Sequence, residues 1–101
     1  MFGHASFRGI HNRNKGLVMW LLSGEPERWY PATELATLLN IPKRSLFSSL
    51  PKWHNWRYVR RKASQGVFLY SIGSRGASWW KRNRQFAPRG DYQKHVSETK
   101  P

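Results

Sequence analysis

The chain has 101 residues, a formal net charge of +13 and no cysteine. A chain of this length forms one domain with a modest core, which leaves no room for a deep catalytic pocket as well. The lack of cysteine excludes disulfides and thiolate metal sites, and the excess positive charge, which opposes compaction, indicates a polyanionic partner.

The start of the chain is polar and carries Arg8, so we predict a flexible basic arm over residues 1–12. This segment lacks the apolar core of a signal peptide. The longest apolar run, residues 17–22, is far shorter than a membrane span. We therefore expect a soluble protein of the cytoplasm, associated with the nucleoid and without a membrane partner.

A first helix is predicted over residues 13–23. Its apolar residues surround nearly the whole helix axis, so the helix lies either at the centre of the core or half buried in a partner subunit. A turn that contains Pro26 follows. Residues 28–30 then form a short predicted strand, which Pro31 ends.

A second helix is predicted over residues 34–39, with Thr33 as its N-cap. Asn40 tolerates the left-handed backbone conformation that a tight turn needs, and Ile41 is predicted to be buried in that turn. The next helix begins with Pro42, a residue that is favoured at the first helical position.

The third helix has an apolar face with residues at i, i+4 and i+7, formed by Leu46, Leu50 and Trp53 and widened by Phe47. Six polar residues lie outside that face: Lys43, Arg44, Ser45, Ser48, Ser49 and Lys52. Pro51 removes a helix hydrogen bond and clashes with the preceding turn. We therefore expect the regular helix to kink or end near Leu50.

A hairpin is predicted from two strands, residues 58–62 and residues 67–72, which are joined by a turn at residues 64–66. Side chains alternate between the two sides of a strand. The apolar residues at every second position of the later strand are therefore predicted to face inward: Phe68, Tyr70 and Ile72.

A last helix is predicted over residues 74–86, and residues 87–101, which lack apolar periodicity, form a predicted disordered tail. Trp79 and Trp80 are adjacent in this helix, so both cannot face one core. We hypothesise that one meets a second subunit in a homodimer formed through the first and last helices. The other tryptophans that we expect in the core are Trp20, Trp53 and Trp56.

The pattern over residues 13–86 resembles the winged helix-turn-helix DNA-binding family, as in small bacterial and archaeal transcription regulators. Ala36 stands where the two helices of that family cross, Asn40 and Ile41 stand in its turn, and the third helix corresponds to its recognition helix. The position before the wing, often glycine in the family, is Arg57 here. The resemblance implies an α+β fold with three helices, a short strand, a two-stranded wing and a C-terminal helix.

The resemblance also implies DNA binding by the exposed side of the recognition helix. The charge pattern agrees, because residues 35–90 contain no Asp or Glu, and an α-helix fits the major groove. We expect Arg44 to contact guanine, and Lys43 and Lys52 to contact phosphates. We expect the hydroxyls of three serines to contact bases or phosphates: Ser45, Ser48 and Ser49. The alternative interpretation of the whole set is a solvated helix face that binds no DNA.

The wing supplies further polar side chains for the phosphate backbone or for the minor groove, where narrow A·T tracts attract arginine. The alternative interpretation is a charged hairpin that merely prevents edge-to-edge pairing of strands. The wing residues that we assign to DNA are Arg60, Arg61, Lys62 and Gln65.

The sequence thus predicts a double-stranded DNA-binding protein that regulates transcription. Two alternatives stay open: a nucleoid architectural protein with weak sequence preference, and a winged helix that binds RNA or protein. The four histidines are not clustered as metal ligands are, and no Ser-His-acid or paired-carboxylate arrangement is suggested. We therefore expect no enzymatic activity, cofactor, metal or small-molecule substrate.

Overall fold

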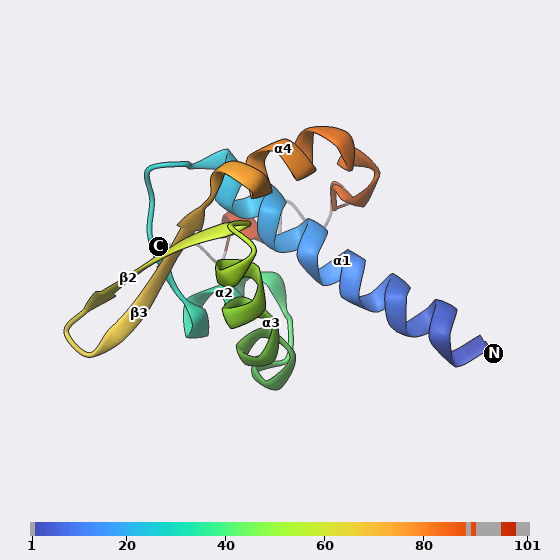
Figure 1. Cartoon of the computed structure of the whole chain (residues 1–101), viewed down its shortest axis with the longest axis horizontal. Coiled ribbons are helices and arrows are strands. Elements are labelled where there is room, and N and C mark those ends of the chain that lie inside the picture. Colours follow the sequence, from blue (N-terminus) through green and yellow to red (C-terminus); the bar gives the residue numbers. More distant parts are fainter. Residues whose placement is uncertain (1, 89, 91–95, 99–101) are drawn as a thin grey trace.

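The chain folds into helices packed around a small antiparallel sheet (Figure 1). This computed structural model describes residues 2–88, 90 and 96–98, with side chains from residue 13 onward. The elements, in chain order, are α1 (Phe2–Gly24), β1 (Tyr30–Pro31), α2 (Ala32–Leu39), α3 (Lys43–Asn55), β2 (Val59–Ser64), β3 (Val67–Ile72), α4 (Ser74–Arg82) and the 3-10 helix η1 (Arg84–Phe86).

Helix α1 passes through the middle of the molecule, and its N-terminal half projects beyond the other elements (Figure 1). Val18 and Met19 are completely buried within this chain, which explains why apolar residues surround the helix axis. The helix begins at Phe2. The helix thus extends into residues 2–12, the segment predicted as a flexible basic arm, and the flexibility of that arm stays a prediction; Met1 lies outside the described residues. A helix already anchored in a core grows by one residue at a time without a new nucleus.

Helices α2 and α3 form the helix-turn-helix. Helix α2 begins at Ala32, and Pro31 occupies the cap position in an extended conformation. The prediction of Thr33 as the N-cap is therefore wrong, because β1 leads straight into the helix. Asn40 has the predicted left-handed conformation, with φ 52° and ψ 43°, and Ile41 is buried as predicted.

Helix α3 continues through Pro51 to Asn55, so the predicted end near Leu50 is wrong, and the alternative, a kink there, stays a prediction. Proline inside a helix costs about 3 kcal/mol. Trp53, one turn further on, is 1% exposed, and a buried tryptophan is worth about 3–5 kcal/mol relative to alanine. Burial of Trp53 therefore outweighs the cost. Phe47, whose carbonyl loses its helical donor to Pro51, is exposed, so water can satisfy that carbonyl.

The sheet has the strand order β1-β3-β2, and both neighbouring pairs are antiparallel. Strands β2 and β3 form a hairpin, hereafter called the wing, which turns at Gln65 and Gly66. These two residues have positive φ values of 52° and 78°, as a two-residue type I′ turn requires. The predicted hairpin is confirmed, and its first strand extends two residues further than expected, to Ser64.

The two ends of the wing differ in burial. Tyr70 and Ile72 are buried as predicted, but Phe68 is 50% exposed, so its predicted inward position is wrong. Phe68 shares a side of the sheet with Tyr70 but lies nearer the tip, where the wing extends past the helices (Figure 1). On the opposite side, Ser71 is completely buried and its hydroxyl donates to the Pro26 carbonyl at 2.8 Å.

The C-terminal region departs from the prediction in two places. The helix expected over residues 74–86 is divided at Asn83 into α4 and η1, because the Asn83 side-chain amide donates to the Trp79 carbonyl (2.8 Å). Val96 is 2% exposed and belongs to the core, which differs from the disordered tail predicted over residues 87–101 at this one residue; the rest of the tail stays a prediction. The other tail residues outside the description are 89, 91–95 and 99–101.

The tryptophans that we assigned to the core divide into two groups. Trp53 is buried and Trp20 is partly buried against the core. Trp56 is 52% exposed, so its assignment is wrong. Trp56 is the C-cap of α3, and it lies beyond the last turn of the helix that packs on the body.

Candidate nucleic-acid interface

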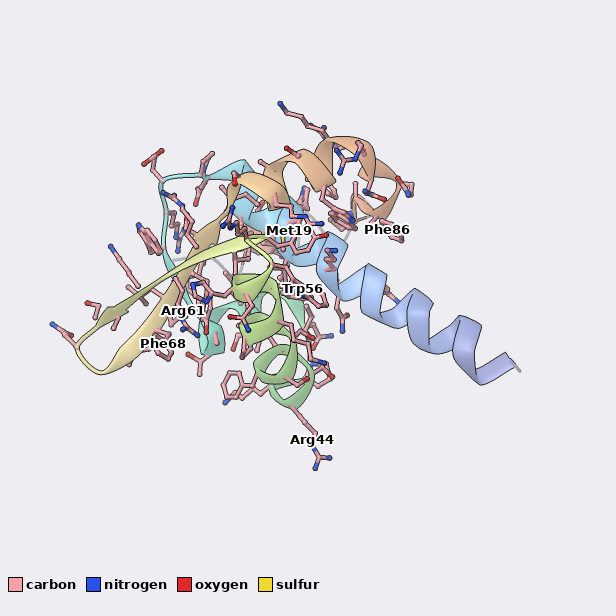
Figure 2. The ribbon with its side chains drawn as sticks, in the orientation of Figure 1. Met19, Arg44, Trp56, Arg61, Phe68 and Phe86 are labelled. Atoms are coloured by element: carbon pink, nitrogen blue, oxygen red, sulfur yellow. The ribbon has the colours of Figure 1, made fainter. Side chains whose placement is uncertain are left out.

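The side of α3 that points away from the body carries Arg44, Ser48 and Lys52, which follow one another at four-residue spacing. Residues at this spacing share one helix face, and all three are exposed because Leu46, Leu50 and Trp53 hold the opposite face in the core. Figure 2 shows the Arg44 side chain pointing away from the molecule near the start of α3.

The remaining predicted residues of α3 lie beside this face. Lys43 and Ser45 are exposed, whereas Ser49 is partly buried. The Ser48 hydroxyl donates to the Ser45 carbonyl at 2.9 Å. In this arrangement Ser48 presents its oxygen as an acceptor, so it suits a base amino group better than a phosphate oxygen.

The predicted wing residues do not gather on one side of the hairpin. Arg61 pairs with Tyr70 in the sheet register, and paired residues of an antiparallel sheet lie on the same side. The Arg61 guanidinium lies 4.3 Å from the centre of the Phe68 ring, and this side of the wing shares a groove with Phe47 and Leu50 of α3. Arg61 therefore lies on the side that faces α3.

Arg60 and Lys62 lie on the other side of the wing, over the Trp29 ring at 5.1 Å and 4.5 Å from its centre. Arg60 donates to the carbonyls of Ile72 (2.9 Å) and Pro26 (3.1 Å). These bonds tie the loop after α1 to the sheet, so Arg60 has a structural role. Sequence reasoning missed this role because hydrogen bonds to main-chain carbonyls leave no pattern in the sequence.

The two tryptophans of α4 are engaged within this chain. Trp80 is buried, and the Trp79 ring stacks on Phe86 with 6.0 Å between ring centres. The ammonium of Lys15 lies 3.6 Å from the centre of the Tyr58 ring and 4.6 Å from that of Trp79. Burial lowers the pKa of Lys15, and the aromatic faces stabilise its charge.

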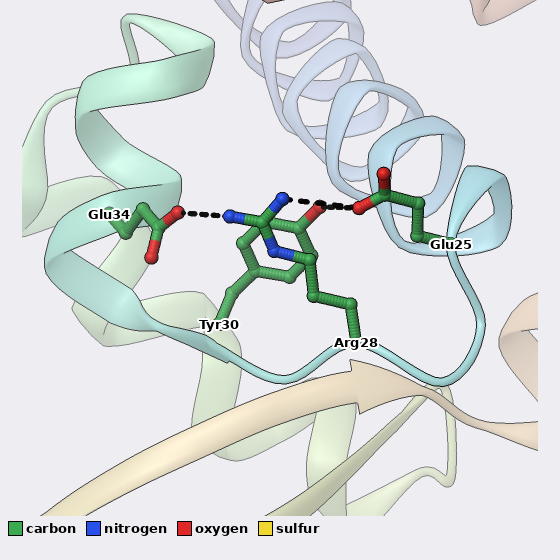
Figure 3. Close-up of polar contacts among 4 residues, drawn as sticks. All are labelled: Glu25, Arg28, Tyr30 and Glu34. Atoms are coloured by element: carbon green, nitrogen blue, oxygen red, sulfur yellow. Dashed lines mark hydrogen bonds and ion pairs between the residues drawn. The ribbon is translucent and has the colours of Figure 1, made fainter. Parts of the chain in front are cut away.

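Two of the five acidic residues share one arginine beside β1 (Figure 3). The Arg28 guanidinium lies 3.2 Å from the Glu25 carboxylate and 2.8 Å from that of Glu34. The Tyr30 hydroxyl donates to Glu25 at 3.0 Å. Arg28 therefore offsets one of the two carboxylate charges beside β1.

Tyr30 gives the folded chain a sensitivity to alkaline pH. Burial, and after it the hydrogen bond to Glu25, raise the pKa of its hydroxyl to about 12. Above about pH 10 the unfolded chain loses this proton while the folded chain keeps it. Stability is therefore fully present below pH 10 and is lost as pH rises towards 12.

Tyr30→Phe is expected to destabilise the chain by about 1 kcal/mol at pH 7, because it removes one partly buried hydrogen bond. The difference from the wild type is expected to shrink between pH 9 and pH 11, since phenylalanine does not ionise. Urea unfolding of both proteins across this range measures the difference. A gap that stays constant would contradict the assignment.

Arg57, which follows the C-cap residue of α3, has a positive φ of 66°. Glycine is favoured at such a position because it lacks a Cβ. The positive φ therefore explains why the winged-helix pattern often has glycine where this chain has Arg57. The carbonyl of Arg57 accepts the amide of Arg75 at 3.2 Å. Arg57, Arg75 and Trp56 line a shallow depression at the end of α3. The sequence predicts no site at Arg57 and Arg75, although both belong to the acid-free segment.

Within the part of the chain that the structure describes, no three histidine or acidic residues lie close enough together to hold a metal ion. None of the described helices combines the length and apolar character that crossing a membrane requires.

The sequence matches no protein-family model and no curated protein. Its structure matches solved structures of ZitR mutants from Lactococcus lactis. The apo form of one mutant has 15% identity and a TM-score of 0.58, and the match covers 95% of this chain and 69% of that one. A second mutant has 13% identity and a TM-score of 0.59, over 84% and 67% of the two chains. The predicted α+β winged helix-turn-helix fold is thus confirmed.

Proposed function

We propose that this protein binds double-stranded DNA and regulates transcription. In this proposal α3 enters the major groove and the wing lies on the phosphate backbone or in the adjacent minor groove. The observation that carries the proposal is the outward face of α3, where Arg44, Ser48 and Lys52 are exposed in a segment without Asp or Glu. The likeness to ZitR, a winged-helix regulator of the MarR family, supports it.

Each residue has a separate proposed role. Arg44 reads guanine through its two parallel donors, while the neighbouring Lys43 and Lys52 neutralise phosphates. Ser45, Ser48 and Ser49 supply hydroxyls beside them. In the wing, Arg61 holds the backbone on the side facing α3, and Gln65 reaches out at the tip. Lys62 adds charge from the other side, where Arg60 positions the strand.

A second candidate function is a nucleoid architectural protein that binds mainly by charge. The favouring observation is the small number of base-reading side chains, since α3 has no asparagine or glutamine before Asn55 to pair with adenine. Selection from random duplexes distinguishes the two functions, because a regulator enriches one site and an architectural protein enriches none. Both functions place the protein in the cytoplasm.

A homodimer through α1 and α4 is also part of the proposal, because winged-helix proteins that read paired half-sites present two recognition helices. The N-terminal half of α1 projects from the body (Figure 1), where a second copy can reach it. Sedimentation at tens of micromolar tests this, and a single species of monomer mass would exclude the dimer.

Fluorescence anisotropy across a salt series tests the main proposal with a random duplex, its single strand and an RNA hairpin. Six or more phosphate contacts predict a log–log salt slope steeper than about −5 for the duplex. The duplex is expected to bind more tightly than the RNA hairpin. Preference for RNA, or weak duplex binding at low salt, would overturn the proposal.

Arg44→Ala and Arg61→Ala are expected to differ in kind. Loss of a base-reading arginine costs about 1–3 kcal/mol on the preferred site and relaxes base preference. Loss of a phosphate contact weakens all duplexes alike and lowers the salt slope by about 1. Binding to a panel of duplexes at several salt concentrations measures both. Equal weakening of every duplex by both variants would contradict this division of roles.

A further inference from the structure

The described part of the chain leaves a small set of large hydrophobic side chains about half exposed, and most of them gather in one place. Phe47, Val67 and Phe68 are 49%, 50% and 50% exposed, and all three line a single groove between α3 and the wing. Leu50 and Tyr70 contribute to its walls. Exposed apolar surface that is gathered in this way marks a contact site more often than scattered apolar residues do.

The charge around the groove indicates which kind of partner fits. Arg61 lies against the Phe68 ring at 4.3 Å, and Lys43 and Arg44 are exposed on the helix beside it. Apart from Ala32 and Thr33, which precede Glu34, the lining residues come from the segment 35–90, which contains no acid. The groove thus combines an apolar lining with a positive border, so its partner must present an apolar group close to negative charge.

A DNA duplex has this combination. The C5-methyl group of thymine is an apolar group in the major groove, next to the phosphates of the same strand. Phe47 stands three residues after Arg44, and residues at this spacing are neighbours on a helix surface. A helix that brings Arg44 to the base edges therefore also brings Phe47 into the major groove of the DNA.

We propose that Phe47 contacts thymine methyl groups in the major groove and makes this protein prefer A·T-rich duplexes. Phe68 closes the contact from the wing, and Arg61 holds the adjacent phosphate. This inference rests on the proposed function, since it requires α3 to lie in the major groove. It adds a means of reading A·T pairs that does not depend on asparagine or glutamine.

The test compares duplexes that differ only in the methyl group. One pair is an alternating dA·dT duplex and the same duplex with deoxyuridine in place of thymidine. The other pair is a mixed-sequence G·C duplex with cytosine or with 5-methylcytosine. The wild type is expected to bind the methylated member of each pair about fourfold more tightly, the factor for burying one methyl-sized group.

Phe47→Ala is expected to bind the two members of each pair equally. Trp56→Ala is the matched control, because Trp56 is as exposed as Phe47 (52% against 49%) but caps the far end of the same helix. The control is expected to keep the fourfold preference. Circular dichroism checks that both variants fold, as the exposure of these side chains predicts.

The outcomes separate this inference from the proposed function. If the wild type binds duplexes with a steep salt slope but does not distinguish the members of either pair, the thymine contact is refuted while DNA binding stands. If Phe47→Ala alters sedimentation instead, a second copy occupies the groove, and the inference also fails. If no duplex binds, both fail together.

Discussion

Trp53→Ala is expected to destabilise the folded chain by about 3–5 kcal/mol, a large part of the total stability of a domain of this size. Trp53 is 1% exposed, and it is the last buried residue of α3, beyond Pro51. Without the Trp53 ring, nothing offsets the cost of proline inside the helix. The last turn of α3 is then expected to unfold, and Lys52, which lies in that turn, is expected to lose its fixed position. Urea unfolding and duplex binding at low salt measure the two effects.

Trp56→Ala is the control for this prediction. Both tryptophans lie at the end of α3, but Trp56 is 52% exposed, so its loss is expected to change stability by less than about 1 kcal/mol. Similar destabilisation by both substitutions would mean that burial is not what stabilises the helix beyond Pro51. If Trp53→Ala kept full stability, the explanation given for the proline would be wrong.

Gly76→Ala is expected to destabilise the chain by about 1–3 kcal/mol and to lower the melting temperature by roughly 10 °C. A Cβ on Gly76 would overlap the carbonyl oxygen of Tyr58 and lie 2.9 Å from Met19 Sδ. The Tyr58 backbone is held on both sides, since its N–H donates to Trp53 (2.8 Å) and its carbonyl accepts from Gly73 (3.0 Å). The main chain therefore has little freedom to move away.

Gly24→Ala serves as the matched substitution, because a Cβ on Gly24 would meet nothing within 4 Å. Gly24 is the last residue of α1, and alanine there is expected to leave the melting temperature nearly unchanged. Thermal unfolding of the two variants under one set of conditions gives the comparison. An equal change in both would show that chain flexibility, and not the close approach of α4 to Tyr58, determines the result.

The helix-turn-helix was predictable because its signals are local. The buried face of α3 follows from the spacing of Leu46, Leu50 and Trp53, and the turn follows from Asn40, whose left-handed conformation needs no distant partner. The wing was predictable for the same reason, since Gly66 readily adopts the positive φ value of a tight hairpin turn.

The errors share a different cause, which is that burial depends on residues distant in the sequence. Alternation placed Phe68 on the same side of β3 as Tyr70, and that placement holds. Whether the helices cover Phe68 as they cover Tyr70 depends on how far the wing extends past them. In the same way, Pro51 alone predicts the end of a helix, and the packing of Trp53 against the body favours the continuation of α3.

The sequence by itself determined the fold class, the register of α3 and the acid-free charge of the segment that includes the wing, because periodicity, turn residues and charge are properties of neighbouring residues. The tertiary structure decided which contacts the cations of the wing make within the chain. Arg60 hydrogen-bonds to main-chain carbonyls, while Arg61, its neighbour, lies on the side facing α3. It also brought Phe47 and Phe68 into one groove. Neighbouring residues on a strand point to opposite sides, and contacts from distant segments then determine what each side does.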